Sequence, residues 1–236
     1  METENQFTTT VQYRLIILIS ATGIALSVYD EANSLISTKK MEFGSPVPTS
    51  DEIIGLLSAD SQINSSNVRV IVESDNYSFV PDAIFRPADA QILLGFEHKP
   101  EKSEKLLYSS VIAWSCVNVF SIQSAIYTAL IKLFPNIEVE HHLSYVLTDK
   151  AIPQVADNLY IWVRNKKLDV VVFSNRELKL VNTYPYAAPE DFTYHTLNVI
   201  EQLALNINTC KVTLLNAEKR MELKAVLEKY VLVDSL

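Results

Sequence analysis

The 236 residues carry 20 basic and 28 acidic side chains, a formal net charge of −8 at pH 7. With 48% hydrophobic and 20% charged residues, the chain has the composition of a globular protein with a packed core, which excludes an intrinsically disordered one. The negative charge, without any long Lys- or Arg-rich run, argues against nucleic acid as a partner because phosphate backbones would be repelled.

The first feature along the chain is the apolar run RLIILISATGIALSVYD at residues 14–30. A signal peptide would open with a basic segment, whereas the residues before this run include Glu2 and Glu4. A membrane-spanning helix needs about twenty apolar residues, and this run is broken by polar residues and stops at Asp30. We therefore expect neither a signal peptide nor a membrane span.

The same run is rich in β-branched residues, and Ala21-Thr22-Gly23 interrupts it where a turn would lie. This predicts antiparallel strands at 13–19 and 24–30, followed by a third strand at about 35–43. The next expected elements are a helix at 51–58, a strand at 68–74, a helical stretch around 88–96, a charged linker at 98–105, a strand pair within 107–121, a helix at 122–134 and a strand at 137–141.

The three-strand pattern returns in NLYIWVRNKKLDVVVFSNRELKLVNTYPY, residues 158–186. After it, Pro189 suits the first position of a helix, and the acidic residues that follow complement the helix dipole. In chain order this half predicts three strands separated by turns at 165–166 and 174–176, a helix from Pro189 to about 206, a strand at 211–215 and a helix from 218 to about 230.

Two copies of three antiparallel strands, each followed by helix and strand, describe the duplicated ribonuclease H-like architecture of the actin superfamily. We therefore predict an α/β fold of two βββαβα-type lobes with mixed sheets. The first lobe is expected at residues 1–150, with an insertion around 75–110, and the second at residues 151–236.

The two cysteines, Cys116 and Cys210, lie in apolar stretches far apart in the sequence. Isolated cysteines of this kind are more often buried free thiols than a disulfide pair. This predicts a reducing compartment, and together with the missing signal peptide it predicts a cytoplasmic protein.

The segments IALSVYD, FVPDAIF, LDVVVFSNRELKLVNTY and YAAPEDFTYHTLNVIEQL resemble a bacterial family of unknown function and about this length. Its members have an actin-like ATPase fold. More distantly, the chain is similar to the cytoplasmic actin-like modules of type IV pilus assembly and type II secretion. The resemblance covers about residues 13–230 and implies the fold; function has to be argued separately from the site.

In active members of that superfamily each lobe has a hairpin turn with an aspartate and glycines, because only glycine lets backbone amides approach a phosphate closely. The first turn here has Ser20, Thr22 and Gly23 but no aspartate, and the second, with Arg164 and Lys166, has neither residue type. The glycine-rich turn for adenosine is replaced by Leu-Leu-Asn-Ala-Glu at 214–218. These three departures from the superfamily's pattern predict an actin-like fold without ATP hydrolysis and without a cofactor.

Five residues are the candidates for a nucleotide or another anion in the cleft between the lobes: Ser20, Thr22, Gly23, Arg164 and Lys166. The alternative for the second turn is a solvated hairpin tip, which lysine and asparagine favour by themselves. The sequence leaves both interpretations open, the anion site and the solvated hairpin tip.

Tyr184, Tyr186 and Tyr194 form a second candidate site, a protein-binding patch, because tyrosine supplies large contact area. The alternative is that these rings cover the junction between helix and sheet.

Metal and hydrolase chemistry is not predicted. Glu138, Glu140 and His142 would share one face of a strand, but no second His or Cys cluster completes a site, and an exposed strand edge is expected instead. The first strand has no carboxylate for a two-magnesium nuclease, and the sequence contains no G-x-S-x-G, H-E-x-x-H or P-loop motif.

Three functions follow as hypotheses. The first is a catalytically silent interaction or scaffold module whose partner is a protein. The second is a degenerate nucleotide-binding protein with weak or no ATPase activity. The third is a peripheral platform subunit of a membrane assembly, which would bind a helix of a partner because it has no membrane span of its own.

Overall fold

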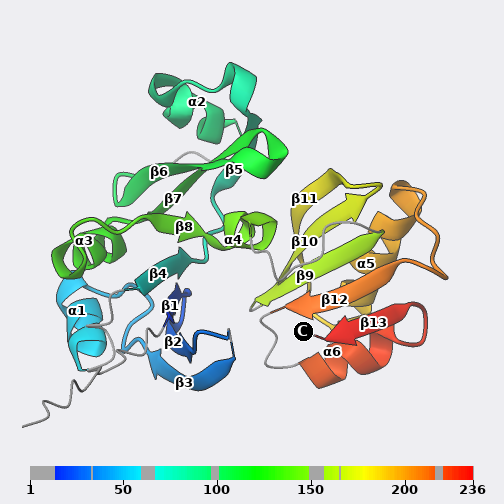
Figure 1. The fold of residues 1–236 in the computed structure, drawn as a ribbon, viewed down its shortest axis with the longest axis horizontal. Helices are drawn as coiled ribbons and strands as arrows, with labels where there is room; N and C mark the ends of the chain where they lie inside the picture. The colour runs from blue at the N-terminus through cyan, green and yellow to red at the C-terminus, as the bar shows by residue number, and fades with distance from the viewer. Residues whose placement is uncertain are drawn as a thin grey trace, which may run out of the picture. The chain divides into compact units, whose positions relative to one another are not determined.

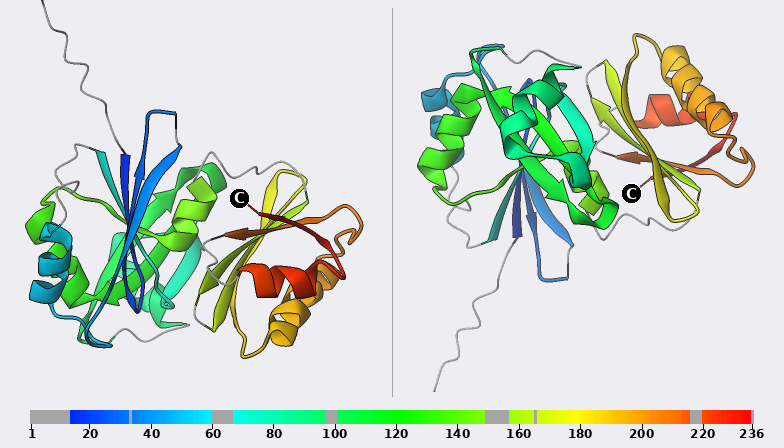
Figure 2. Two further views of the ribbon diagram at one scale, coloured as in Figure 1. Left: turned by 90° about the horizontal axis from the view of Figure 1, so that it is seen from below. Right: turned by 90° about the horizontal axis from the view of Figure 1, so that it is seen from above.

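The computed structural model describes residues 14–32, 34–59, 67–96, 101–148, 157–164, 166–215 and 220–235. The chain forms two compact units, Met1–Tyr145 and Val146–Leu236. Figures 1 and 2 show a mixed sheet flanked by helices in each of them. The lobe boundary expected at 150/151 stays a prediction.

The main sheet of the first unit has the strand order β3-β2-β1-β4-β8. The three strands predicted first in the chain are confirmed as an antiparallel meander, and β4 and β8 then add in parallel. The strands are β1 Arg14–Ile19, β2 Gly23–Tyr29, β3 Leu35–Glu42, β4 Asn67–Val72 and β8 Val139–His141.

Two helices, α1 (Ser50–Ser58) and α3 (Ser124–Leu133), pack on one face of this sheet. Alternate strand residues such as Ile17 and Val70 point to that face and are fully buried, as the period of two in a strand requires. The hydroxyl of Thr49 caps α1 by accepting the amide N–H of Glu52 at 3.2 Å.

A second, smaller sheet lies between β4 and β8 in the chain and has the strand order β5-β7-β6. Its strands are β5 Tyr77–Pro81, β6 Glu104–Val111 and β7 Cys116–Gln123, with α2 (Ala90–Gly95) packed on it through Ala90 and Leu94 (Figure 1). The predicted strand pair within 107–121 is confirmed as β6 and β7. The linker was expected to extend to residue 105, but it ends before Glu104, where β6 begins.

The second unit repeats the plan with the strand order β11-β10-β9-β12-β13. The β10–β11 turn has Asn175 and Arg176 in the left-handed conformation, which matches the twist of a two-residue hairpin. The elements are β9 Asn158–Arg164, β10 Lys167–Ser174, β11 Glu177–Pro185, α5 Pro189–Gln202, β12 Lys211–Leu215, α6 Arg220–Leu227 and β13 Leu232–Ser235.

Further details differ from the prediction. Helix α5 ends at Gln202, four residues early, because Ala204 adopts a left-handed φ of 51° that cannot continue a helix. The short helix α4 (His142–Thr148) and the short strands β5 and β13 were not predicted, since each is shorter than a periodic pattern needs to be recognised.

Candidate functional site

The first hairpin turn, between β1 and β2, is closed by hydrogen bonds within itself. The amide N–H of Ser20 donates to the carbonyl of Gly23 at 2.9 Å, and the Ser20 hydroxyl donates to the same oxygen at 3.2 Å. The amide N–H of Thr22 donates to the Ser20 Oγ at 3.3 Å. Two amides that could face a phosphate therefore have partners inside the turn.

Gly23 is in this turn for a packing reason. Its φ is not in the left-handed region, so it is not needed for conformational freedom. A Cβ at this position would overlap the main-chain oxygen of Met41 and come within 3.0 Å of the Cα of Glu42. The glycine lets β3 approach β2 closely, a role that requires no phosphate.

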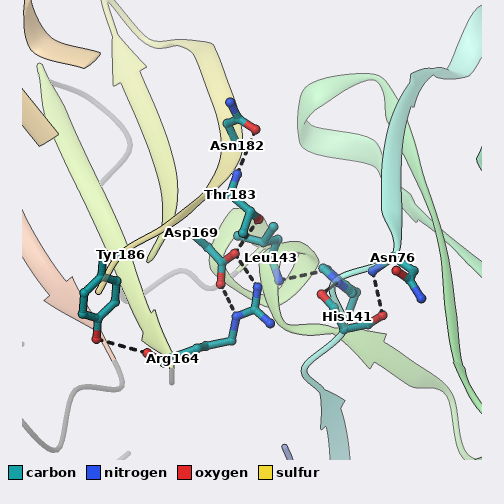
Figure 3. Close-up of polar contacts among 9 residues, drawn as sticks. Asn76, His141, Leu143, Arg164, Asp169, Asn182, Thr183 and Tyr186 are labelled. Carbon is teal, nitrogen blue, oxygen red and sulfur yellow. Dashed lines mark hydrogen bonds and ion pairs between the residues drawn. The ribbon is translucent and has the colours of Figure 1, made fainter. Parts of the chain in front are cut away.

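The second hairpin turn, between β9 and β10, is held by a buried ion pair that the sequence pattern does not reveal. Figure 3 shows Arg164 reaching toward Asp169, with Nε to Oδ2 at 2.6 Å and Nη2 to Oδ1 at 2.7 Å. The hydroxyl of Thr183 donates to Asp169 Oδ1 at 2.6 Å. The two charged side chains are only 9% and 0% exposed.

The charge of Arg164 is thus compensated by a carboxylate at its own hairpin. A bidentate pair fixes the guanidinium plane and neutralises its charge, so an external anion would meet a cation that is already compensated. A single acidic residue inside the apolar run LDVVVF was the available signal, because a buried carboxylate needs a partner. Its partner, five residues away across a hairpin, depends on strand register.

Tyr186 closes the same turn from the other side. Its hydroxyl donates to the carbonyl of Arg164 at 3.2 Å, and its amide N–H donates to the carbonyl of Lys166 at 3.0 Å. Burial raises the pKa of the Tyr186 hydroxyl above its ordinary value. Lys166 stands exposed at the tip with a left-handed φ of 58°, and Asn165 lies outside the described residues.

The three candidate tyrosines occupy different environments. Tyr186 packs edge-on against Phe192, with ring centroids 5.7 Å apart. Tyr184 stacks on His195 at 5.0 Å, and Tyr194 meets the same imidazole edge-on at 5.4 Å. Of the three, only Tyr194 is largely exposed, at 64%. Tyr184 and Tyr194 therefore share one row of rings, and Tyr186 belongs to the hairpin.

His141 and His142 are buried, which corrects the expected exposed strand edge. The amide N–H of Leu143 donates to His141 Nδ1 at 3.2 Å (Figure 3), so that nitrogen carries no proton. The other ring nitrogen, Nε2, then donates to the carbonyl of Ser74 at 3.1 Å. His142 begins helix α4, which takes it off the strand face of Glu140.

Glu140 itself receives a bidentate pair from Arg69, at 2.7 and 2.9 Å. Within the described ranges, no group of three or more His, Cys, Asp and Glu side chains is placed to hold a metal ion. Among the helices of that same part of the chain, none has the length and apolar character to cross a membrane.

Comparisons with known proteins place the fold. A crystal structure of a protein from Bacteroides thetaiotaomicron VPI-5482, described as having an actin-like ATPase fold and unknown function, matches with a TM-score of 0.80 at 21% identity. The match covers 98% of this chain and 93% of that chain. The structure of the PilM-PilN type IV pilus biogenesis complex matches with a TM-score of 0.60 at 10% identity, over 94% of this chain and 88% of that chain.

A search of curated proteins found no match. At identities this low, the structural matches establish the predicted actin-like fold and leave activity open. A family profile described as "Protein of unknown function (DUF3822)" matches residues 2–232. The chain therefore belongs to that family of proteins of unknown function and has an actin-like ATPase fold.

Proposed function

We propose that this protein is a catalytically silent scaffold that binds other proteins. The observation that carries the proposal is that both hairpin turns, where active actin-like ATPases bind phosphate, engage polar groups internally: the Ser20 and Thr22 amides in the first and the Arg164 guanidinium in the second. A phosphate-binding loop has to present N–H groups or cations toward the ligand.

In the first turn, the Ser20 and Thr22 amides and the Ser20 hydroxyl are all engaged within four residues. Rearranging them for a phosphate would cost the internal bonds before any ligand bond formed. In the second turn, the Arg164 guanidinium is bound by Asp169 and does not point outward to a ligand. These contacts support a turn kept for structure.

A protein partner is supported from two sides. One matched structure is a protein complex, PilM with PilN, so the fold is compatible with binding another chain. On this chain, the exposed Tyr194 continues a row of rings through His195 to Tyr184. Tyrosine is enriched among the residues that dominate protein interfaces. We place the protein in the cytoplasm, and its two free cysteines support a reducing compartment.

Retained nucleotide binding is the competing function, because Thr22 and Lys166 are exposed at the tips of the two turns. A thermal shift of the purified chain with millimolar ATP or ADP and magnesium separates the two, since a ligand that binds only the folded state raises its melting temperature. We expect no rise. A rise of several degrees that Lys166→Ala removes, and that Lys179→Ala leaves intact, would overturn the silent-scaffold proposal.

Partner binding is tested by capture from the native organism's lysate followed by purified-component binding. The wild-type chain should retain a defined protein, and Tyr194→Ala should weaken that complex, whereas Tyr230→Ala, which removes an exposed tyrosine elsewhere in the second unit, should not. A purified chain that retains no protein partner would contradict the proposed function.

A further inference from the structure

The outward side of helix α5 carries an exposed aromatic ring between two carboxylates. Glu190, Tyr194 and Glu201 are all exposed, and Tyr194 is 64% exposed. With about 3.6 residues per turn, these three positions lie within roughly 40° of one another around the helix axis, so they form one line. Figure 2 shows α5 and α6 side by side on one face of the second unit's sheet. We call the line of Glu190, Tyr194 and Glu201 the Tyr194 face.

Both carboxylates of the Tyr194 face are available to a partner. Within the part of the chain that the structure describes, neither Glu190 nor Glu201 has a side-chain hydrogen bond or an ion pair. The helix sequence PEDFTYHTLNVIEQ contains no Lys or Arg that could compensate them. Asp191 is not counted in the face, because its carboxylate accepts the amide N–H groups of Ala187 and Ala188.

The described lysines of the elements packed against α5 have carboxylate partners of their own. Helix α6 and strand β11 contact α5 through apolar side chains. On α6, Lys224 lies 3.5 Å from Glu228, and on β11 Lys179 pairs with Glu177. The Tyr194 face therefore keeps its negative charge, and a positively charged partner complements it.

The ring of Tyr194 is held on one side and open on the other. It meets the imidazole of His195 edge-on at 5.4 Å, and His195 in turn stacks on Tyr184 of β11 at 5.0 Å. These contacts hold the ring without covering it. An open ring beside a carboxylate suits a guanidinium, which stacks on the aromatic face and forms charge-assisted hydrogen bonds with the carboxylate.

We propose that the Tyr194 face binds an extended, arginine-bearing segment of a protein partner. This inference rests on the proposed scaffold function and names the chemistry of the partner. One arginine stacks on Tyr194, and the arginines on either side of it pair with Glu190 and Glu201. Lysine fits less well, because its ammonium group is a point charge that does not stack as a plane.

The rise of the helix sets the spacing of the arginines. Glu190 and Glu201 are 11 positions apart, which is about 16 Å along the axis of a helix. An extended chain rises about 3.3 Å per residue, so about five residues of the partner cover that length. Tyr194 lies about 6 Å along the axis from Glu190, or about two extended residues. The expected pattern in the partner is therefore R-x-R-x-x-R.

The experiment uses the full chain and three fluorescein-labelled peptides in anisotropy titrations at low salt. The peptides are GSRSRSSRSG, its lysine counterpart GSKSKSSKSG and its acidic counterpart GSESESSESG. The wild-type chain should bind the arginine peptide about tenfold more tightly than the acidic one and about threefold more tightly than the lysine one, because only arginine combines stacking with pairing.

Substitutions on the Tyr194 face locate the peptide. Glu190→Gln/Glu201→Gln keeps the size of both side chains and should weaken binding of the arginine peptide about tenfold. Tyr194→Leu should weaken it about threefold, whereas Tyr194→Phe keeps the ring and should bind like wild type. The control Glu42→Gln/Asp51→Asn removes two exposed carboxylates from the first unit and should also bind like wild type.

Several outcomes would overturn the Tyr194 face as a docking site. These are no binding of the arginine peptide, equal binding of the lysine or acidic peptide, and an equal loss of affinity in the control variant. A molecular mass that doubles with concentration, and returns to that of one chain in Glu190→Gln/Glu201→Gln, would place a second copy on this face and overturn it too.

Failure of this inference is distinguishable from failure of the scaffold function. If a captured protein partner binds Glu190→Gln/Glu201→Gln as tightly as wild type, the arginine-bearing segment is refuted and the scaffold remains. If the chain instead binds nucleotide with a several-degree thermal shift, the silent-scaffold proposal fails whatever the peptides do.

Discussion

Arg164 and Asp169 face each other across the β9–β10 hairpin, and both guanidinium contacts to the carboxylate are 2.6–2.7 Å long. The pair is nearly removed from solvent, and Thr183 on β11 donates a further bond to the carboxylate. One ion pair thus connects the first two strands of the second unit's sheet to the third. It also engages the Arg164 guanidinium, which the sequence had suggested as an anion ligand.

Breaking this pair from one side should be costly. Arg164→Ala leaves a buried carboxylate without its counter-charge, and we expect the free energy of unfolding to fall by about 3–5 kcal/mol. Arg164→Met/Asp169→Leu should lose less than either single variant, because no charge is then left buried. Urea unfolding at pH 7 measures the double variant and its two singles, Arg164→Met and Asp169→Leu; a double variant less stable than either single would contradict the explanation.

Gly23 provides a test of the first turn without any ligand. Gly23→Ala adds a Cβ that overlaps the Met41 main-chain oxygen, so the strands must separate, and we expect a loss of about 1–3 kcal/mol, the usual cost of overpacking. Gly55→Ala is the matched control, since nothing lies within 4 Å of its added Cβ. It lies inside α1 and should stabilise by about 0.5–1 kcal/mol. Thermal melts of both variants check this: the melting temperature should fall for Gly23→Ala and rise for Gly55→Ala.

Asp191 makes the start of helix α5 sensitive to pH. Its carboxylate accepts the amide N–H groups of Ala187 and Ala188 at 3.0 and 3.1 Å, which lowers its pKa. The stabilisation is therefore present above the unfolded pKa of about 3.9 and is lost as the pH falls through the lower folded value.

Asp191→Ala should consequently lower the melting temperature at pH 7, and the difference from wild type should shrink below about pH 4. Glu190→Ala removes a neighbouring exposed carboxylate and should change the melting temperature less. A wild-type to Asp191→Ala difference that stays constant down to pH 2 would rule out the charged cap as its cause.

Cys210 should be chemically inert in the folded protein. It is fully buried, and burial followed by the nearby charge of Asp157 raises its thiol pKa to about 11. At pH 8 we expect iodoacetamide to modify Cys210 only after unfolding, because the thiolate is the reactive form. Mass spectrometry of peptides from native and urea-treated protein checks this; rapid native labelling at Cys210 would contradict the buried placement.

The thiol also adds a stability effect at high pH. Because its folded pKa is raised, the folded state keeps a proton that the unfolded state releases near pH 8.5. Stability from this group is therefore present below about pH 8.5 and decreases as the pH rises toward 11. Cys210→Ser removes the thiol and should therefore remove this loss of stability at alkaline pH. A series of urea unfolding midpoints measured at increasing pH checks this.

Most of the strands and helices could be predicted from local pattern, because β-branched runs, turn residues and helical periodicity are properties of neighbouring residues. The meander of β1 to β3 and its repeat in β9 to β11 were found in this way. Helix α4 was missed for the same reason: His142 follows a strand directly, and seven residues are too few for a periodic signal.

The candidate site was a different case. The sequence by itself determined that the aspartates and glycines of an active phosphate site are missing, since this depends only on which residues are present. Only the tertiary structure decided what replaces them: the register of β9 on β10 joins Arg164 to Asp169, and the approach of β3 explains Gly23. Contacts between strands depend on the pairing register, which turn type and loop length set in a hairpin and which the residue types alone do not give.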